Sequence, residues 1–306
     1  MNRKAPRSID EYLRQLRAEL AGEDPALVQD ALYDAEEYLR AEIAAHPERS
    51  EADTLELIAS TYGAPEEVAA AYRDTEAKVK AALRPPVPPA SQSPNVLRRF
   101  FGVYLDSRAY TALFYMLLSL ATGVLYFTFA VTGLAMSAGL LFVIIGIPFF
   151  LAFIGVARAI SLGEGRLLEA VSGERMPRRP VHPGPPRRWW QQILDMITDR
   201  RTWTTLAYLI LMLPLGIFYF TAAVVGLSVG VSFILAPVAR SAARLGWLQD
   251  DWVTLGPTPD WLGTGPRLIL LLIAGVLILT VLLHLARGAV RLHARIAKAL
   301  LVTGIT

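Results

Sequence analysis

Two stretches of this sequence decide the fold: DSRAYTALFYMLLSLATGVLYFTFAVTGL at 106–134 and DRRTWTTLAYLILMLPLGIFYFTAAVVGL at 199–227. They align without a gap at a spacing of 93 residues, and 15 of the 29 positions are identical. The identities include tyrosines, glycines and charged residues, which a shared apolar composition does not reproduce. Each stretch also holds a run close to the roughly 20 apolar residues that a membrane-crossing helix needs. The sequence therefore predicts two copies of one membrane unit.

A second crossing follows each of these stretches. The chain is 54% hydrophobic with a mean hydropathy of +0.40, which is high for a soluble domain. We predict an all-α fold in which four helices cross the membrane, at 109–132, 138–160, 203–226 and 266–286. Because each unit crosses twice, the two hairpins should run parallel, related by an axis along the membrane normal.

The segments that flank the crossings are also expected to be repeated. An amphipathic interfacial helix is predicted before each hairpin, at 96–101 and 189–194. An amphipathic exit helix is predicted after each hairpin, where Ala157-Arg158-Ala159 aligns with Ala286-Arg287-Gly288 and Arg166 aligns with Arg295. Repeat 1 then covers residues 96–172 and repeat 2 covers residues 189–301.

The loops predict the orientation. The connection from Arg158 to Arg201 holds nine arginines and five acids, and the C-terminal tail is also basic, so both are expected in the cytoplasm. This gives an N-in, C-in protein of a bacterial inner membrane. The first outer turn is predicted at Gly133–Gly139. The second is longer, an outer loop at 237–265 that only repeat 2 carries.

The membrane half, residues 96–306, resembles a known family through "TWTTLAYLILMLPLG" before the third crossing and through its longer second outer loop. It is similar to the putative sensor membrane domain of actinobacterial-type histidine kinases. In those kinases an ATP-binding domain follows. Here no phosphoacceptor segment or Gly-rich nucleotide box comes before Thr306, so kinase activity is not expected.

Residues 1–84 form a separate, acidic part of the chain, with a net charge of −7 against +10 for the rest. Capping signals at Ser8, Asp24, Ser50 and Pro65 predict four short helices, which Gly22 and Gly63 help to delimit. The pattern "EYLRQLRAEL…YDAEEYLRAEI…STYGAPEEVAAAY" resembles the HAAS signalling domain. That resemblance implies a cytoplasmic helical module, often encoded beside a PadR-like transcription regulator. The proline-rich linker at 85–95 is expected to hold this domain away from the membrane.

Few residues suggest chemistry. The repeated Gly-x-x-Tyr-Phe-Thr is interpreted either as a ligand cavity or as tight helix packing, through Tyr126, Thr128, Tyr219 and Thr221. His284 offers a proton relay or a metal ligand, but it has no acidic or histidine partner in any crossing, so it is expected to make an interfacial or interhelical hydrogen bond. The outer loop is expected either to rest on the leaflet or to bind a partner or ligand, through Trp247, Asp250, Asp251, Trp252 and Trp261. The central turns of the crossings contain no charged residue, and the chain has no cysteine. We expect no enzyme activity, cofactor, metal site or direct nucleic-acid binding.

These features lead to two hypotheses of function. The first is a non-catalytic membrane sensor that relays an envelope or lipid signal through residues 1–84 to a cytoplasmic partner, a PadR-like regulator or a kinase. The second is an accessory or lipid-handling subunit of a transporter or larger membrane complex. Besides the lipid bilayer, integral membrane partners or a homo-oligomer are compatible with either hypothesis.

Overall fold

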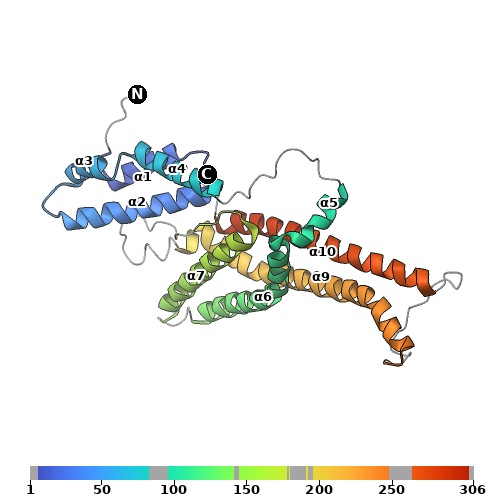
Figure 1. Cartoon of the computed structure of the whole chain (residues 1–306). Coiled ribbons are helices and arrows are strands. Elements are labelled where there is room, and N and C mark those ends of the chain that lie inside the picture. Colours follow the sequence, from blue (N-terminus) through green and yellow to red (C-terminus); the bar gives the residue numbers. More distant parts are fainter. Residues whose placement is uncertain are drawn as a thin grey trace.

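The fold was examined in a computed structural model that describes residues 6–82, 96–140, 145–177, 179, 191, 196–247 and 264–302. Within these residues the regular elements are helices, so the all-α prediction is confirmed. Figure 1 shows a small N-terminal domain beside a group of long helices. The N-terminal domain consists of α1 (Ile9–Glu19), α2 (Pro25–Ala45), α3 (Glu51–Thr61) and α4 (Pro65–Ala82).

The short helices of the N-terminal domain begin where the capping residues predict. Ser8 accepts a hydrogen bond from the backbone N–H of Glu11, and Ser50 accepts one from Asp53. Asp24 caps α2 in the same way through Ala26. Local sequence therefore defines the ends of these helices before any tertiary contact does.

A single apolar core holds the four short helices together. Tyr12, Leu16 and Leu39 are fully buried in it, together with Leu55 of α3. The Tyr12 hydroxyl donates a 2.8 Å hydrogen bond to the carbonyl of Gly63, whose φ of 113° turns the chain between α3 and α4. This bond ties the first helix to the last turn of the domain.

Four long helices follow the short helix α5 (Val96–Phe101) and the 3-10 turn η1 (Gly102–Leu105). They are α6 (Ser107–Leu140), α7 (Gly146–Ser172), α9 (Arg200–Arg244) and α10 (Thr264–Leu301). All four are long and apolar enough to cross a membrane. The first interfacial helix thus has a helical counterpart in α5, whereas most of the second lies outside the described residues.

The boundaries of the long helices correct several predictions. The first outer turn was predicted too early, because α6 continues through 133–139 to Leu140. The predicted outer loop also begins too early, since α9 passes Pro237 and ends at Arg244. The predicted amphipathic exits are the last turns of α7 and α10, continuous with the crossings. Helical hydrogen bonding on both sides of these residues outweighs the local glycine, proline and charge signals, although Pro237 itself has no N–H to donate.

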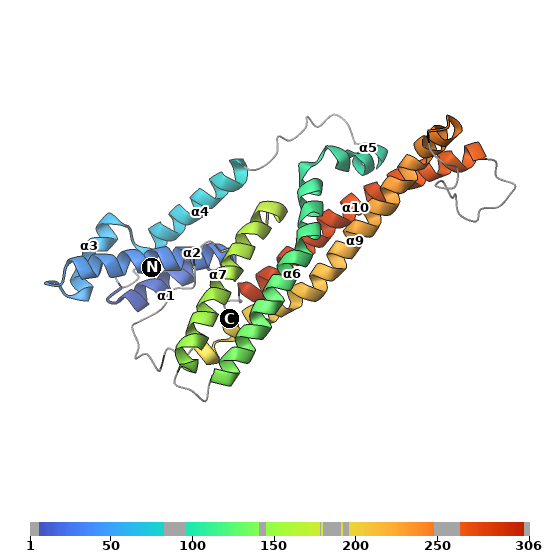
Figure 2. The same ribbon diagram turned by 90° about the horizontal axis from the view of Figure 1, so that it is seen from below.

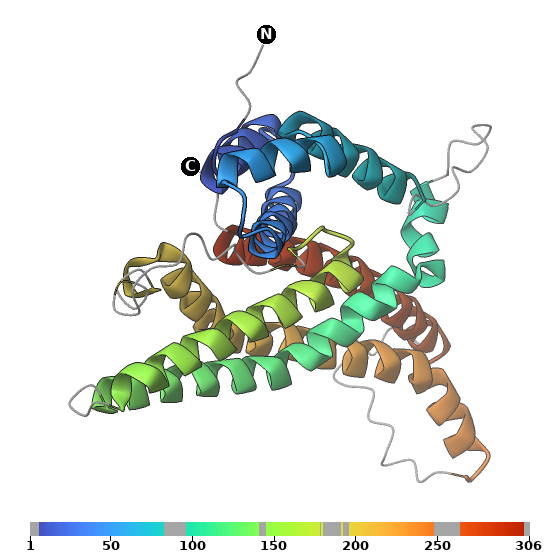
Figure 3. The ribbon, with the colours of Figure 1, turned by 90° about the vertical axis from the view of Figure 1, so that its left-hand side faces the viewer.

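The bundle is built around a close crossing of α6 and α9, seen as an X in Figure 3. A Cβ atom added to Gly123 would lie 2.5 Å from the carbonyl oxygen of Met212, and one added to Gly216 would lie 2.2 Å from that of Ser119. Glycine is required at both positions because backbone, not a movable side chain, fills the space. These two contacts exchange when the 93-residue shift is applied.

The second helix of each hairpin packs beside the first. Gly133 of α6 faces the ring of Phe153 on α7, and Gly226 of α9 faces Leu282 on α10. Figure 2 shows α10 running along α9. In Figure 3 the end of α6 and the end of α9 both point away from the N-terminal domain. In Figure 2, however, α6 and α9 end at opposite ends of the crossing, so the predicted parallel run of the two hairpins does not describe this arrangement.

The N-terminal domain is not held away from the bundle. Its helix α2 contacts residues that follow α7, through ion pairs described below. The proline-rich linker lies outside the described residues. The prediction concerned the distance from the membrane, which these contacts do not test; they show that opposite charges hold the domain against the end of the bundle.

Candidate functional site

A buried carboxylate lies inside the bundle. Glu164 of α7 is only 1% exposed. Its Oε1 accepts a 2.6 Å hydrogen bond from the hydroxyl of Tyr115, and its Oε2 accepts a 2.9 Å bond from Tyr126. The hydroxyl of Tyr208 lies 3.4 Å from Oε1. Among the described residues the groups that bind this acid are phenol hydroxyls rather than cations.

A buried imidazole lies next to this acid. His293 of α10 is fully buried, and its Nε2 is 3.0 Å from the Tyr208 hydroxyl. The rings of Tyr115, Tyr208 and Tyr219 surround it with centroid distances of 5.7, 5.9 and 5.7 Å. Its Nδ1 is buried without a hydrogen-bond partner in the described part of the chain. Tyr208 therefore connects the acid to the imidazole, and we call these residues, with Tyr126, the Glu–His cluster.

The cluster members occupy equivalent positions in the two units. Tyr115 and Tyr208 are 93 residues apart, as are Tyr126 and Tyr219, while Glu164 and His293 are 129 apart. The same spacing of 129 separates Arg158 from Arg287 in the aligned exit segments. Sequence reasoning missed Glu164 and His293 because it assigned both segments to amphipathic helices outside the bundle. Extending the Arg158–Arg287 alignment by six residues would have paired them.

Two ion pairs connect the first hairpin to the second. Arg158 lies 3.1 Å from Asp199, and Arg287 lies 3.0 Å from Asp106. Each aspartate also caps its own helix, accepting from the backbone N–H two residues later. Both carboxylates therefore cap their own helix and also join the two hairpins.

The predicted ligand positions divide between the inside and the outside of the bundle. Tyr126 and Tyr219 belong to the Glu–His cluster. Thr128 and Thr221 are exposed on the bundle surface. The tyrosine and the threonine of each copy therefore face different ways, because residues two apart on a helix are separated by roughly 200° around its axis. The choice between a ligand cavity and helix packing stays a prediction.

The remaining candidates make simpler contacts. His284 Nε2 is 2.9 Å from the carbonyl oxygen of Phe100, and the two rings stack at 5.5 Å. The predicted interhelical hydrogen bond is therefore present. Trp247 is 78% exposed at the end of α9. The other outer-loop candidates, Asp250, Asp251, Trp252 and Trp261, lie outside the described residues.

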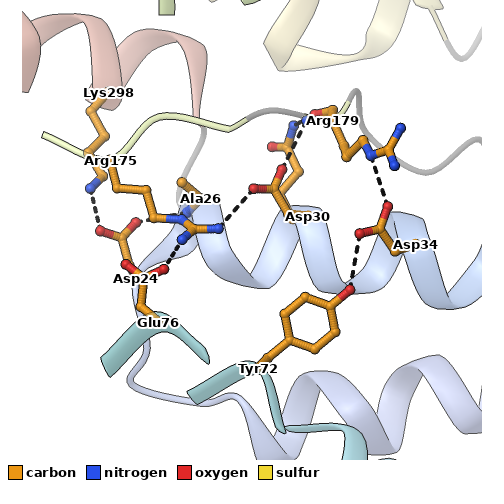
Figure 4. A network of polar contacts seen from close by, with 10 residues as sticks. Asp24, Ala26, Asp30, Asp34, Tyr72, Glu76, Arg175, Arg179 and Lys298 are labelled. Atoms are coloured by element: carbon orange, nitrogen blue, oxygen red, sulfur yellow. Dashed lines mark hydrogen bonds and ion pairs between the residues drawn. The ribbon is translucent and has the colours of Figure 1, made fainter. Parts of the chain in front are cut away.

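A second polar site joins the N-terminal domain to the bundle (Figure 4). Arg175, three residues after the end of α7, pairs with Asp30 at 3.1 Å and also with Glu76. Arg179 lies 2.9 Å from Asp34, and its backbone N–H donates to Asp30. In these contacts, acids of α2 and α4 pair with arginines of the connection that follows α7. With Lys298, which pairs with Asp24 at 2.7 Å, we call this site the acidic–basic clamp.

The clamp is fixed on both sides by buried groups. Arg175 is 17% exposed, and the Asp30 side chain is 7% exposed. Met176, the next residue, is buried against the bundle core. On the other side, burial and the neighbouring Asp34 raise the pKa of Tyr72, so its hydroxyl stays protonated and donates to Asp34 at 3.0 Å. The clamp therefore links the core of the bundle to the N-terminal domain.

Comparison with known families decides the identity of the membrane half. The family described as "Putative sensor" matches residues 115–301. The chain belongs to this sensor family. The matched region begins at Tyr115 and contains every member of the Glu–His cluster, whereas the N-terminal domain lies before it. Searches among curated proteins and among solved structures gave no match.

Proposed function

We propose that this protein is a non-catalytic membrane sensor whose bundle reads an envelope or lipid condition and whose N-terminal domain passes the state to a cytoplasmic protein. Membership of the sensor family supports a sensing role for the bundle. The main support for a relay to the cytoplasm is the acidic–basic clamp, because it attaches the N-terminal domain to residues at the ends of the long helices. The resemblance of the domain to HAAS modules suggests a PadR-like regulator or a kinase as the partner.

The position of the clamp supports a relay. Gly173, with a φ of 74°, ends α7, and Arg175 follows two residues later. A shift or rotation of α7 would move the guanidinium away from Asp30 and Glu76. Leaving such partly buried carboxylates unpaired costs about 3–5 kcal/mol. A small motion in the bundle is therefore sufficient to favour a released domain with an exposed acidic face.

The same contacts support the proposed topology. The N-terminal domain, the connection after α7 and the C-terminal end of α10 meet in the clamp, so all three lie at one end of the bundle. The arginine-rich connection favours the cytoplasm for that end. We therefore place the protein in a bacterial inner membrane with both termini inside. The reciprocal glycine contacts and cross-hairpin ion pairs support two repeats related by an approximate twofold axis.

The clamp gives a direct test. The variant Arg175→Glu/Arg179→Glu reverses two clamp charges, and Arg291→Glu/Arg295→Glu makes the same charge change on exposed positions of α10. Spin labels at two exposed positions, one on α2 and one on α10, report the distance between the domain and the bundle in nanodiscs. We expect a longer and broader distance distribution for the clamp variant only.

The output is measured in cells with the same pair of variants. The clamp variant should change the transcript level of genes controlled by the partner without any envelope stimulus, and the α10 variant should not. Equal responses from both variants would contradict a relay through the clamp. Recovery of stoichiometric integral membrane proteins with wild type and both variants alike would favour the accessory-subunit hypothesis instead.

A further inference from the structure

The Glu–His cluster has a charge problem that its hydrogen bonds do not solve. Glu164 and His293 are both almost completely buried in an apolar bundle. The described groups that face them are phenols: Tyr115 and Tyr126 from α6, and Tyr208 and Tyr219 from α9. A lone carboxylate or a lone imidazolium in such a place is costly, because phenols supply hydrogen bonds but no compensating charge.

One bound proton solves this problem for the pair as a whole. With one proton, the pair is either a carboxylic acid beside a neutral imidazole or a carboxylate beside an imidazolium. Both forms have no net charge. With no proton or with two, the pair carries an uncompensated charge inside the bundle. Because the two groups are linked, their protons belong to the pair rather than to either residue.

The Tyr208 hydroxyl makes the two groups one site. It lies 3.0 Å from Nε2 of His293 and 3.4 Å from Oε1 of Glu164. It has a single hydrogen, so it can donate to only one of them at a time. When the imidazole carries its proton on Nε2, that proton is donated to the hydroxyl oxygen and the hydroxyl donates to the carboxylate. An imidazolium must donate from Nε2, whereas a neutral imidazole with its hydrogen on Nδ1 accepts there, so protonation of that tautomer reverses this hydrogen bond.

We propose that Glu164 and His293, joined through Tyr208, form a binding site for a single proton, and that gain or loss of a proton there is the input that the bundle reads. This inference deepens the proposed sensor function and rests on it. The two units place an acid and a base at one equivalent position, so the site exists only where the two hairpins meet.

The site is connected to the clamp through the helices that carry it. Glu164 lies on α7, and Arg175 follows it by 11 residues; His293 lies on α10, five residues before Lys298. An uncompensated charge in the site favours separation of α7 from α10, or entry of water between them. Either change moves the clamp cations Arg175 and Lys298 relative to one another. Because the partners of both cations lie on the N-terminal domain, that domain cannot keep both ion pairs.

Histidine NMR on the full chain tests the proton site. The protein, labelled with ¹⁵N in its four histidines, is placed in phosphatidylcholine nanodiscs and titrated from pH 4 to pH 9. His293→Asn identifies the His293 signals. We expect the midpoint of the His293 transition to move by about one pH unit in Glu164→Gln and also in Tyr208→Phe. Tyr208→Phe keeps the ring and removes only the hydroxyl that joins His293 to Glu164. Tyr219→Phe, whose ring contacts His293 without a hydroxyl bond, should leave the midpoint in place.

Two results overturn the inference. A midpoint that is unchanged in both Glu164→Gln and Tyr208→Phe shows that the pair is not coupled. A clamp distance that stays constant as the pH crosses the wild-type midpoint shows that the proton is not the input. In that case the response to Arg175→Glu/Arg179→Glu decides separately whether the relay itself stands, because that variant opens the clamp without involving the proton site.

Discussion

The crossing of α6 and α9 makes the sharpest prediction about stability. Alanine at Gly123 would place a Cβ atom 2.5 Å from a backbone oxygen of α9, and alanine at Gly216 would place one 2.2 Å from a backbone oxygen of α6. Ordinary contact for a Cβ atom begins at 3.4 Å, so the helices must part by about 1 Å. Overpacking of this kind costs about 1–3 kcal/mol, and the upper end is expected because backbone atoms, unlike a side chain, cannot move away by changing rotamer.

Alanine also gains about 1 kcal/mol over glycine inside a helix, so each single variant should lose about 2 kcal/mol net. For a bundle of this size that corresponds to a fall in Tm of about 4–8 °C. The double variant Gly123→Ala/Gly216→Ala should lose less than the sum, since the separation that admits one methyl group also admits the other. Separated helices also weaken the Glu–His cluster, which takes tyrosines from both of them.

Thermal unfolding followed by tryptophan fluorescence in detergent measures these differences. The matched control is Gly163→Ala on α7, where a Cβ atom meets nothing within 4 Å. It should keep or slightly raise the Tm. If Gly123→Ala and Gly216→Ala were as stable as Gly163→Ala, the close crossing would not exist, and the bundle would have to be arranged differently.

Three further predictions concern other parts of the chain. Tyr126→Phe removes a donor to Glu164 and should cost about 1–3 kcal/mol of stability, whereas Thr128→Val on the exposed surface should cost almost nothing by the same thermal assay. Residues 1–84 in isolation should be helical by circular dichroism, and Leu39→Asp, which buries an unpaired charge, should unfold them; a coil spectrum for the unmodified fragment would contradict this. In this cysteine-free chain, a membrane-impermeant maleimide should label Trp247→Cys in intact cells and Arg291→Cys only after permeabilisation; the reverse pattern would invert the proposed topology.

Local sequence determined much of the fold because the deciding forces act over short distances along the chain. The caps at Ser8, Asp24 and Ser50 and the turn at Gly63 predicted the helices of the N-terminal domain. Runs of apolar residues predicted the number of long helices, since the thickness of a bilayer sets their minimum length. Their ends were predicted less well, as at Pro237, because helical hydrogen bonding continues past a weak stop signal when nothing competes with it.

Only the tertiary structure brought the polar residues together. Glu164 and His293 lie 129 residues apart, and each looks like part of an ordinary amphipathic stretch, so nothing in either local sequence shows that both are buried. Their meeting depends on how two hairpins cross at Gly123 and Gly216, which is a property of packing. The sequence by itself determined the helices, the repeat and the separation of charge between the two halves of the chain. Which acid faces which base, in the bundle and in the clamp, was decided by the assembly of the helices, because charge pairing acts between surfaces that only folding brings into contact.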